Sequence, residues 1–126
     1  MSPDQLADEP FCYLTTTGRI TGRSHEIEIW FGIDGWTIYL LSGGRESSDW
    51  VRNIMRQAEV SARIGRREFA GRGRIVEDTA EDALARRLLL EKYSPTYSGD
   101  LTDWGRTARP VAIDLERPSA DPWTSR

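Results

Sequence analysis

Two glycine-containing turns in this chain of 126 residues place arginine beside backbone that a ligand can approach closely. The first turn, residues 17–23, holds two glycines, and the second, residues 42–45, reads Ser-Gly-Gly-Arg. Glycine leaves backbone N–H groups open to an anion, and guanidinium groups bind phosphate or carboxylate through paired hydrogen bonds. We therefore expect an anion site that uses Arg19, Arg23 and Arg45, although turn formation alone would also require these glycines.

The charge distribution is compatible with an anionic ligand. The net charge is −3, yet residues 15–75 carry ten Arg against seven Asp or Glu. Clustered positive charge concentrates anions, and an ordinary solvated surface is the alternative explanation. The overall acidity disfavours a nucleic-acid partner that would bind Arg66, Arg67, Arg72 and Arg74. Neither turn matches the dinucleotide-binding or P-loop fingerprint.

Single residues exclude several other kinds of chemistry. Cys12 is the only cysteine, so an internal disulfide is excluded, and its apolar surroundings predict a buried thiol. His25 is the only histidine, which excludes a site built on several histidines, and we expect no metal. His25 is either a phosphate contact or a surface residue. We find no catalytic triad and no paired acids.

Alternating apolar residues predict a mainly β fold with helices. Six strands are expected, at residues 11–17, 25–33, 36–42, 59–64, 68–76 and 110–116. Helices are expected at residues 47–57 and 79–93, and residues 94–107 are expected to be irregular. Short connections between the strands favour a compact antiparallel barrel.

The chain is expected to form one domain over residues 11–117. Residues 1–10 are predicted to be a loose acidic leader, and residues 118–126 a flexible tail. No apolar run is long enough to span a bilayer, and the first residues do not resemble a signal peptide. These features predict a cytoplasmic protein with no transmembrane segment.

Three motifs carry a resemblance to a known family. LTTTGRITGR at residues 14–23 resembles the turn of the deazaflavin-dependent nitroreductase family. SGGR at residues 42–45 with DWVRNI at residues 49–54, and the region from residue 93 to residue 111, are similar to later elements of that family. The resemblance covers roughly residues 11–117. It implies a six-stranded antiparallel split β-barrel of the FMN-binding, pyridoxamine-phosphate-oxidase-like type, which binds coenzyme F-420 and allows a homodimer.

The resemblance also implies roles for individual residues. It places the cofactor phosphate and acidic tail at Arg19, Ile20, Thr21, Gly22, Arg23 and Ser24, with His25 as a further candidate contact. The deazaflavin ring and its ribityl chain would lie beside Leu40, Leu41, Ser42, Gly43 and Gly44. The helix that flanks the phosphate would contribute Asp49, Trp50 and Asn53. Tyr93 and Tyr97 would border the substrate and are the candidate catalytic residues.

This sequence departs from the family pattern in the residues that would hold the tail. Ile20 stands where many members have Lys, and His25 where many have Arg. The loop after Ser42 is short and lacks a Lys found in nitroimidazole-activating members, a charge that Arg23 or Arg45 could replace in part. The choice between F-420 and FMN therefore stays open at this point.

The implied activity is hydride transfer from reduced deazaflavin to a small activated acceptor such as a quinone, an enone or a nitro compound. Such chemistry resides in the cofactor, so the absence of a triad or metal cluster in the sequence is compatible with it. The alternatives are an FMN-binding protein of the same fold and a non-catalytic carrier of a cofactor or an apolar ligand.

Overall fold

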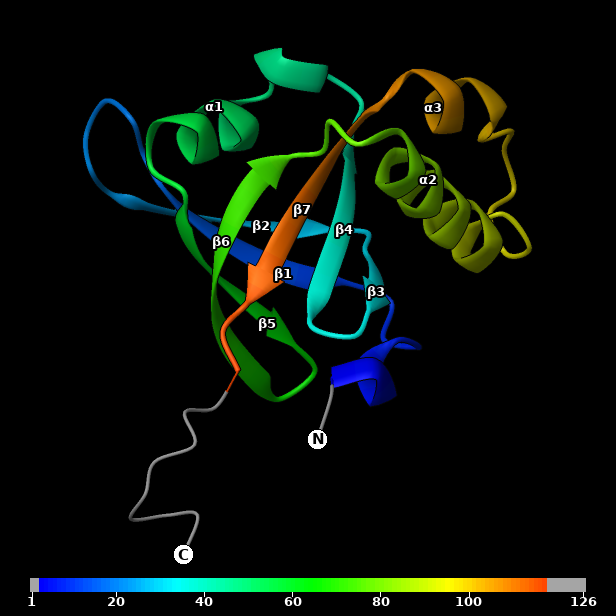
Figure 1. Ribbon diagram of the computed structural model, residues 1–126, viewed down its shortest axis with the longest axis horizontal. Helices are drawn as coiled ribbons and strands as arrows, with labels where there is room; N and C mark the ends of the chain where they lie inside the picture. The colour runs from blue at the N-terminus through cyan, green and yellow to red at the C-terminus, as the bar shows by residue number, and fades with distance from the viewer. Residues whose placement is uncertain (1–2, 118–126) are drawn as a thin grey trace, which may run out of the picture.

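The computed structural model describes residues 3–117 (Figure 1). Its strands are β1 (Cys12–Thr17), β2 (Ser24–Ile29), β3 (Gly32–Asp34), β4 (Thr37–Ser42), β5 (Glu59–Ile64), β6 (Arg67–Ile75) and β7 (Arg109–Leu115). Its helical elements are the 3-10 turns η1 (Pro3–Leu6) and η2 (Arg45–Ser47) and the helices α1 (Asp49–Arg56), α2 (Thr79–Tyr93) and α3 (Thr102–Thr107). None of the helices within residues 3–117 is both long and apolar enough to cross a membrane.

All seven strands belong to one antiparallel sheet, in the order β2-β1-β5-β6-β7-β4-β3. The two edge strands, β2 and β3, are consecutive in the chain and are separated only by Trp30 and Phe31. Two residues can join opposite edges only if the sheet curls back on itself, as Figure 1 shows. The predicted mainly β, barrel-like fold is confirmed.

The predicted number of six strands is wrong, because the expected strand over residues 25–33 is two strands. Its first part ends with Ile29 opposite Cys12 on β1, and its second part begins with Gly32 opposite Tyr39 on β4. The apolar alternation continues through the break, since Ile29, Phe31 and Ile33 all face the barrel core. Alternation reports which face a residue takes, not which strand it pairs with, so the break is not visible in the pattern.

Side chains from α2 satisfy the backbone at this break. The N–H of Phe31 donates to the Tyr93 hydroxyl at 3.0 Å, and the Phe31 carbonyl accepts from Lys92 Nζ at 3.1 Å. The Tyr93 hydroxyl in turn donates to the Pro10 carbonyl at 2.9 Å. Because an unpaired buried backbone group is costly, these contacts stabilise the passage from one sheet edge to the other.

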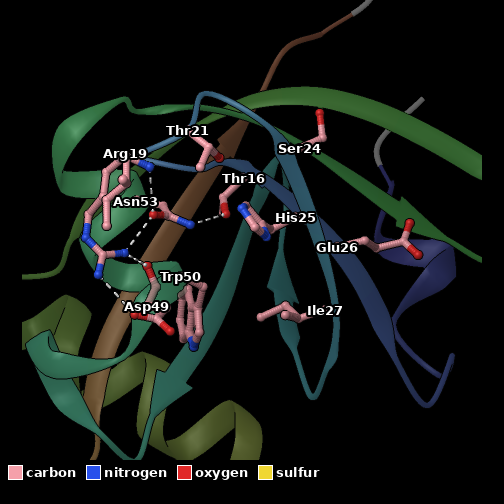
Figure 2. Close-up of a pocket in the computed structure, with 11 residues that line it drawn as sticks. Thr16, Arg19, Thr21, Ser24, His25, Glu26, Ile27, Asp49, Trp50 and Asn53 are labelled. Atoms are coloured by element: carbon pink, nitrogen blue, oxygen red, sulfur yellow. Dashed lines mark hydrogen bonds and ion pairs between the residues drawn. The ribbon is translucent and has the colours of Figure 1, made fainter.

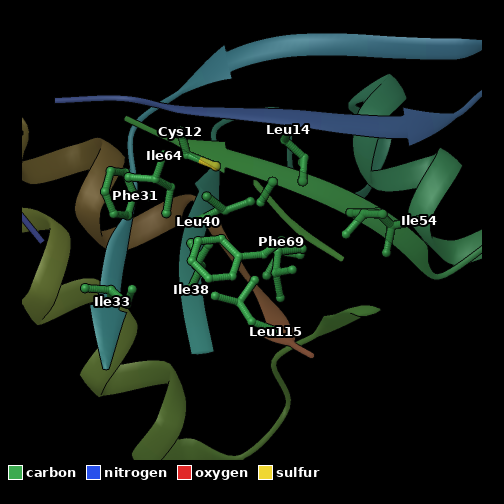
Figure 3. Packing of buried hydrophobic residues seen from close by; sticks show 14 of the residues in the cluster. Cys12, Leu14, Phe31, Ile33, Ile38, Leu40, Ile54, Ile64, Phe69 and Leu115 are labelled. Atoms are coloured by element: carbon green, nitrogen blue, oxygen red, sulfur yellow. The ribbon is translucent and has the colours of Figure 1, made fainter. Parts of the chain in front are cut away.

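The barrel interior holds the main core (Figure 3), to which Cys12, Leu14, Phe31, Ile38 and Phe69 contribute. Helix α1 covers one end of the barrel through Val51 and Ile54, and the N-terminal segment packs Leu6 and Ala7 against the same core. Residues 3–10, which we expected to be loose, therefore pack against the barrel. Cys12 is fully buried as predicted, and burial raises the pKa of its thiol to about 12.

A second core lies between the outer face of the sheet and helices α2 and α3. Tyr39 and Leu41 of β4 pack there against Ala85, Leu89 and Tyr93, whereas the alternate residues of β4 face the barrel. The bounds of α2 agree with the prediction. Its buried face consists of Ala85, Leu89 and Tyr93, whereas Ala80 and Ala83 are exposed. Helix α3 lies in the region expected to be irregular.

Candidate functional site

The turn between β1 and β2 is held by its own backbone. Gly18 N–H donates to the Arg23 carbonyl at 2.7 Å, and Gly22 N–H donates to the Gly18 carbonyl at 2.8 Å. A Cβ on Gly18 would lie 2.6 Å from Nε2 of His25, so only glycine fits there without displacing the imidazole. Gly22 has a φ of +74°, which disfavours other residues. Ile20, at the tip, is 86% exposed.

Asn53 ties this turn to helix α1. Its side chain is 4% exposed, and its Nδ2 donates to Thr16 Oγ1 at 3.1 Å. Its Oδ1 accepts from the Arg19 backbone N–H at 3.1 Å and from the Arg19 guanidinium at 2.9 Å. That guanidinium also pairs with Asp49 at 3.1 Å. The structure thus brings Arg19 together with Asp49 and Asn53, which lie 30 and 34 residues further along the chain.

A cavity of about 640 Å³ opens between this turn, β2 and α1 (Figure 2). We call it the turn cavity, and it is lined by Thr16, Arg19, Ile20, Thr21, Ser24, His25, Glu26, Ile27, Asp49, Trp50 and Asn53. Of the binding residues predicted in this turn and helix, all except Gly22 and Arg23 line it. Sequence reasoning missed Thr16, Glu26 and Ile27. The sequence could have indicated Thr16, because it is a polar residue at an inward position of β1.

The donors in the turn cavity fit a phosphorylated cofactor with a hydroxylated chain. The oxygens of Thr16 and Thr21 accept bonds from Asn53 Nδ2 and Arg23 N–H, so their own hydroxyl hydrogens remain available. The Ser24 hydroxyl makes no hydrogen bond within the described part of the chain. An anion that reaches Arg19 must share this cation with the carboxylate of Asp49.

The second glycine turn is stabilised by Ser42. The Ser42 hydroxyl donates to the Arg45 carbonyl at 2.9 Å and lies 2.8 Å from the Ser48 hydroxyl. Arg45 has a φ of 53°, and its guanidinium donates to the Thr107 carbonyl before α3 ends, away from the residues of the turn cavity. Gly43 and Gly44 are exposed, and a Cβ on Gly43 would lie 3.6 Å from the Trp104 ring.

A second cavity, of about 420 Å³, lies beyond the turn cavity along β2. We call it the aromatic cavity, and it is lined by Glu28, Ile29, Trp30, Leu41, Tyr97, Asp100, Leu101 and Trp104. Trp30 is the centre of its aromatic wall. Its ring meets the rings of Tyr97 and Trp104 edge to face, at centroid distances of 5.5 and 5.6 Å. Consecutive residues of β2 line the two cavities, Ile27 the first and Glu28 the second.

The two candidate catalytic tyrosines occupy different positions. Tyr97 is 46% exposed and lines the aromatic cavity. Tyr93 is 6% exposed, stacks on Trp30 at 4.3 Å, and uses its hydroxyl to hold Phe31 and Pro10. Burial raises the pKa of Tyr93 to about 12, so its hydroxyl stays protonated at neutral pH. Of the predicted ring contacts, Leu41 lines the aromatic cavity and Leu40 lies in the barrel core.

The F-420H(2)-dependent quinone reductase family matches residues 3–116. The chain belongs to this family. Membership implies coenzyme F-420 as the cofactor and an F-420-dependent reductase as the type of enzyme, in agreement with the sequence resemblance. A search of curated proteins finds no significant match.

Solved structures with low sequence identity share the fold of this family member. An F-420-H2-dependent reductase aligns with a TM-score of 0.68 and 20% identity, over 85% of this chain and 94% of its own. A Listeria innocua protein described as a pyridoxamine 5′-phosphate oxidase aligns with a TM-score of 0.66 and 18% identity, over 89% and 88%. A third structure, described as a domain-swapped dimer, aligns with a TM-score of 0.67 and 21% identity, over 85% and 80%. These likenesses support the split-barrel fold.

Proposed function

We propose that this reductase transfers a hydride from reduced F-420 to a small planar acceptor, and that the acceptor is a quinone. The observation that carries the proposal is the position of two complementary cavities along one strand. The turn cavity offers hydroxyl groups and Arg19, whereas the aromatic cavity offers three rings at right-angled contacts. A cofactor with a polar phosphorylated chain and a flat ring would match the two cavities in that order.

The turn cavity is the proposed site for the phosphate and the chain of the cofactor. Arg19 would contact the phosphate, with its guanidinium held in place by Asn53 and Asp49. Thr21, Ser24 and His25 would supply further polar contacts at the same wall. Ile20 and Arg23, which are exposed at the turn, would meet the acidic tail where it leaves the cavity.

The residues between the two cavities are proposed to hold the deazaflavin ring. Leu41 near the end of β4 and the exposed Gly43 just after it lie next to Trp104, and the exposed Gly44 follows. Trp50 offers an apolar surface at the opposite side, in the turn cavity. Flat aromatic ligands favour such apolar walls with a few polar groups.

The aromatic cavity is the proposed acceptor site. Reduced F-420 supplies the hydride when it is bound, so the protein must orient the acceptor, exclude water and provide a proton. Trp30 and Trp104 would fix the plane of the acceptor through ring contacts. The exposed hydroxyl of Tyr97 would donate a hydrogen bond or a proton to the oxygen on which negative charge develops.

We also infer that the protein forms a homodimer. One structural relative is described as a domain-swapped dimer. Light scattering on the purified protein distinguishes a dimer from a monomer.

FMN binding is the second candidate function, and one observation favours it. The tip of the first turn is the exposed apolar residue Ile20, where many relatives carry a lysine for the acidic tail. FMN has a phosphate but no such tail, so the loss of this charge would affect FMN binding less.

A carrier function would leave cofactor binding intact and abolish turnover.

Turnover with reduced F-420 and menadione tests the proposal. Oxidation of the reduced deazaflavin is followed by the return of its absorbance, with protein-free and heat-denatured controls. Menadione-dependent oxidation supports the reductase. Binding of F-420 without oxidation across quinone, enone and nitro acceptors would instead support the carrier.

A further inference from the structure

The aromatic cavity contains two carboxylates and no basic side chain. Glu28 and Asp100 both line it, together with Trp30, Tyr97 and Trp104. The Glu28 carboxylate accepts a hydrogen bond from the Tyr13 hydroxyl at 2.7 Å. The Asp100 carboxylate accepts from the backbone and the hydroxyl of Thr102, at 2.9 and 2.6 Å. Neutral donors thus hold both carboxylates in place.

These two carboxylates differ from their neighbours on the same segments. Glu26, two residues before Glu28 on β2, pairs with Arg63 at 3.9 Å. Asp103, three residues after Asp100, pairs with Arg106 at 3.0 Å. Within residues 3–117, neither Glu28 nor Asp100 forms an ion pair. Among residues 3–117, therefore, no cation makes a direct ion pair with either carboxylate of this cavity.

The contacts of Asp100 favour its negatively charged form. The hydrogen bonds from Thr102 lower the pKa of Asp100 below its ordinary value of 3.8. The turn cavity differs from the aromatic cavity because it is lined by a cation, Arg19, as well as by the carboxylates of Glu26 and Asp49.

We propose that Glu28 and Asp100 make the acceptor site selective by charge, so that it accepts neutral or cationic planar aromatics and rejects anionic ones. The proposal rests on the proposed function of the cavity as the acceptor site. Like charges repel one another over a few ångström, and both carboxylates line the wall that a bound acceptor would touch. The aromatic rings that line the cavity add to the selectivity, because the negative face of an aromatic ring attracts cations.

Charge selectivity is best measured as a ratio of kcat/KM values for two acceptors, because the intrinsic reactivity of each acceptor cancels when the ratio is compared among variants. The kcat/KM for menadione is divided by that for a naphthoquinone sulfonate, with F-420 as the donor. The ratio is compared among wild type, Glu28→Gln, Asp100→Asn and the double variant. Both substitutions keep an oxygen that accepts the hydrogen bond from Tyr13 or Thr102. Asp103→Asn, which removes a carboxylate that Arg106 already neutralises, is the matched control.

We expect each single substitution to raise the relative rate with the sulfonate about threefold to tenfold, and the double variant to raise it further. Higher salt should bring the kcat/KM values for menadione and the sulfonate closer together in wild type, and should have less effect on them in the double variant. Asp103→Asn should leave the ratio unchanged. A ratio that is the same in wild type and the double variant would overturn the proposal.

A binding measurement separates this proposal from the proposed function. The indole N–H signals of Trp30 and Trp104 are followed by NMR in the full chain without cofactor. The titrants are three naphthalenes with the same ring, which carry an ammonium, a hydroxyl or a sulfonate group. We expect the ammonium and hydroxyl compounds to shift these signals at lower concentration than the sulfonate, and the double variant to lose this order.

Equal affinity for the three compounds, or no shift of either signal with any of them, would overturn charge selectivity even if turnover is observed. The proposed order of binding with no turnover would instead contradict the reductase function and leave the selectivity of the cavity standing.

Discussion

At the residue scale, Asn53 has the largest structural consequence for the site. Its buried amide satisfies Thr16 and the backbone and side chain of Arg19, on two different segments. We expect Asn53→Ala to lower the free energy of unfolding by roughly 1–3 kcal/mol, because it leaves buried polar groups unpaired. It should also weaken F-420 binding by about tenfold or more, since Arg19 loses its support.

Chemical denaturation and cofactor titration measure these two effects separately. Gln57→Ala, at the exposed end of the same helix, is the control and should change neither. If Asn53→Ala retains both stability and affinity, the link between the turn and α1 is not what organises the site.

Substitution of Tyr93 should mainly lower stability, whereas substitution of Tyr97 should mainly lower turnover. Tyr93→Phe removes the partner of the Phe31 N–H at the break between β2 and β3, and we expect a loss of roughly 1–3 kcal/mol in stability. Tyr97→Phe should change stability by less than about 0.5 kcal/mol, because its hydroxyl is exposed, and should lower kcat with a quinone.

Thermal unfolding and steady-state kinetics on both variants provide the comparison. The opposite result, a stable Tyr93→Phe with lost turnover and an unstable Tyr97→Phe with full turnover, would assign the catalytic role to Tyr93.

At the scale of elements, the close packing of α1 on β6 determines the shape of the turn cavity. A Cβ on Gly73 would lie 2.7 Å from Ile54 Cγ2 and 3.2 Å from Ile113 Cδ1. Gly73→Ala should therefore push α1 outward, lower stability by roughly 1–3 kcal/mol and weaken cofactor binding through the adjacent Asn53. The double variant Gly73→Ala/Ile54→Ala should recover part of the affinity, because the space lost on β6 is restored on α1. Calorimetric titration of both variants tests this, and equal affinity in wild type and Gly73→Ala would contradict it.

The elements also show which features a single sequence can specify. Helix α2 was predicted from residue 79 to residue 93, because Thr79 with Asp82 resembles a capping box and apolar residues follow at helical spacing. The break at Trp30 and Phe31 was not predictable, since the local pattern is unchanged where the strand changes its partner. Helix α3 has six residues and gains its stability from tertiary contacts of Trp104, which local propensity does not report.

In the candidate site, too, residues with a local sequence signal were predicted, and residues placed by tertiary contacts were not. The turn and α1 were predicted together as a cofactor element through a resemblance that involves Arg19 and Asn53. Arg45 was predicted beside them, but it does not line the turn cavity, and its side chain donates to the carbonyl of Thr107, the last residue of α3. The two carboxylates of the aromatic cavity were not predicted together, because Glu28 on β2 and Asp100 between α2 and α3 meet only in the folded chain.

At the scale of the whole molecule, one ionic network joins the sheet to α2. Arg74 of β6 makes two bonds of 2.7 Å to Glu81, which also accepts the Tyr39 hydroxyl at 2.7 Å, and Arg74 pairs with Asp114 of β7. Arg74 lowers the pKa of Glu81 from its ordinary 4.5 to about 2. A carboxylate with a depressed pKa stabilises the fold above its ordinary value, and this stabilisation is lost as the pH falls through about 2.

Thermal unfolding over that range should show the contribution of Glu81. Glu81→Gln should lower Tm near neutral pH and should flatten the decrease of Tm between the ordinary pKa of 4.5 and about 2. Glu91→Gln, on the exposed side of the same helix, should follow the wild-type profile. Parallel profiles for wild type and Glu81→Gln would show that the network does not contribute to acid stability.

The central claim is that the turn cavity binds coenzyme F-420 through Arg19. Titration of the purified protein with F-420 and with FMN, for wild type and Arg19→Ala, tests this claim most directly. We predict that F-420 binds more tightly than FMN. We also predict that Arg19→Ala weakens F-420 binding by about 10-fold to 100-fold, as expected for charge-assisted hydrogen bonds, while the protein remains folded. Micromolar FMN binding with no F-420 binding, or an F-420 affinity that Arg19→Ala leaves unchanged, would contradict it.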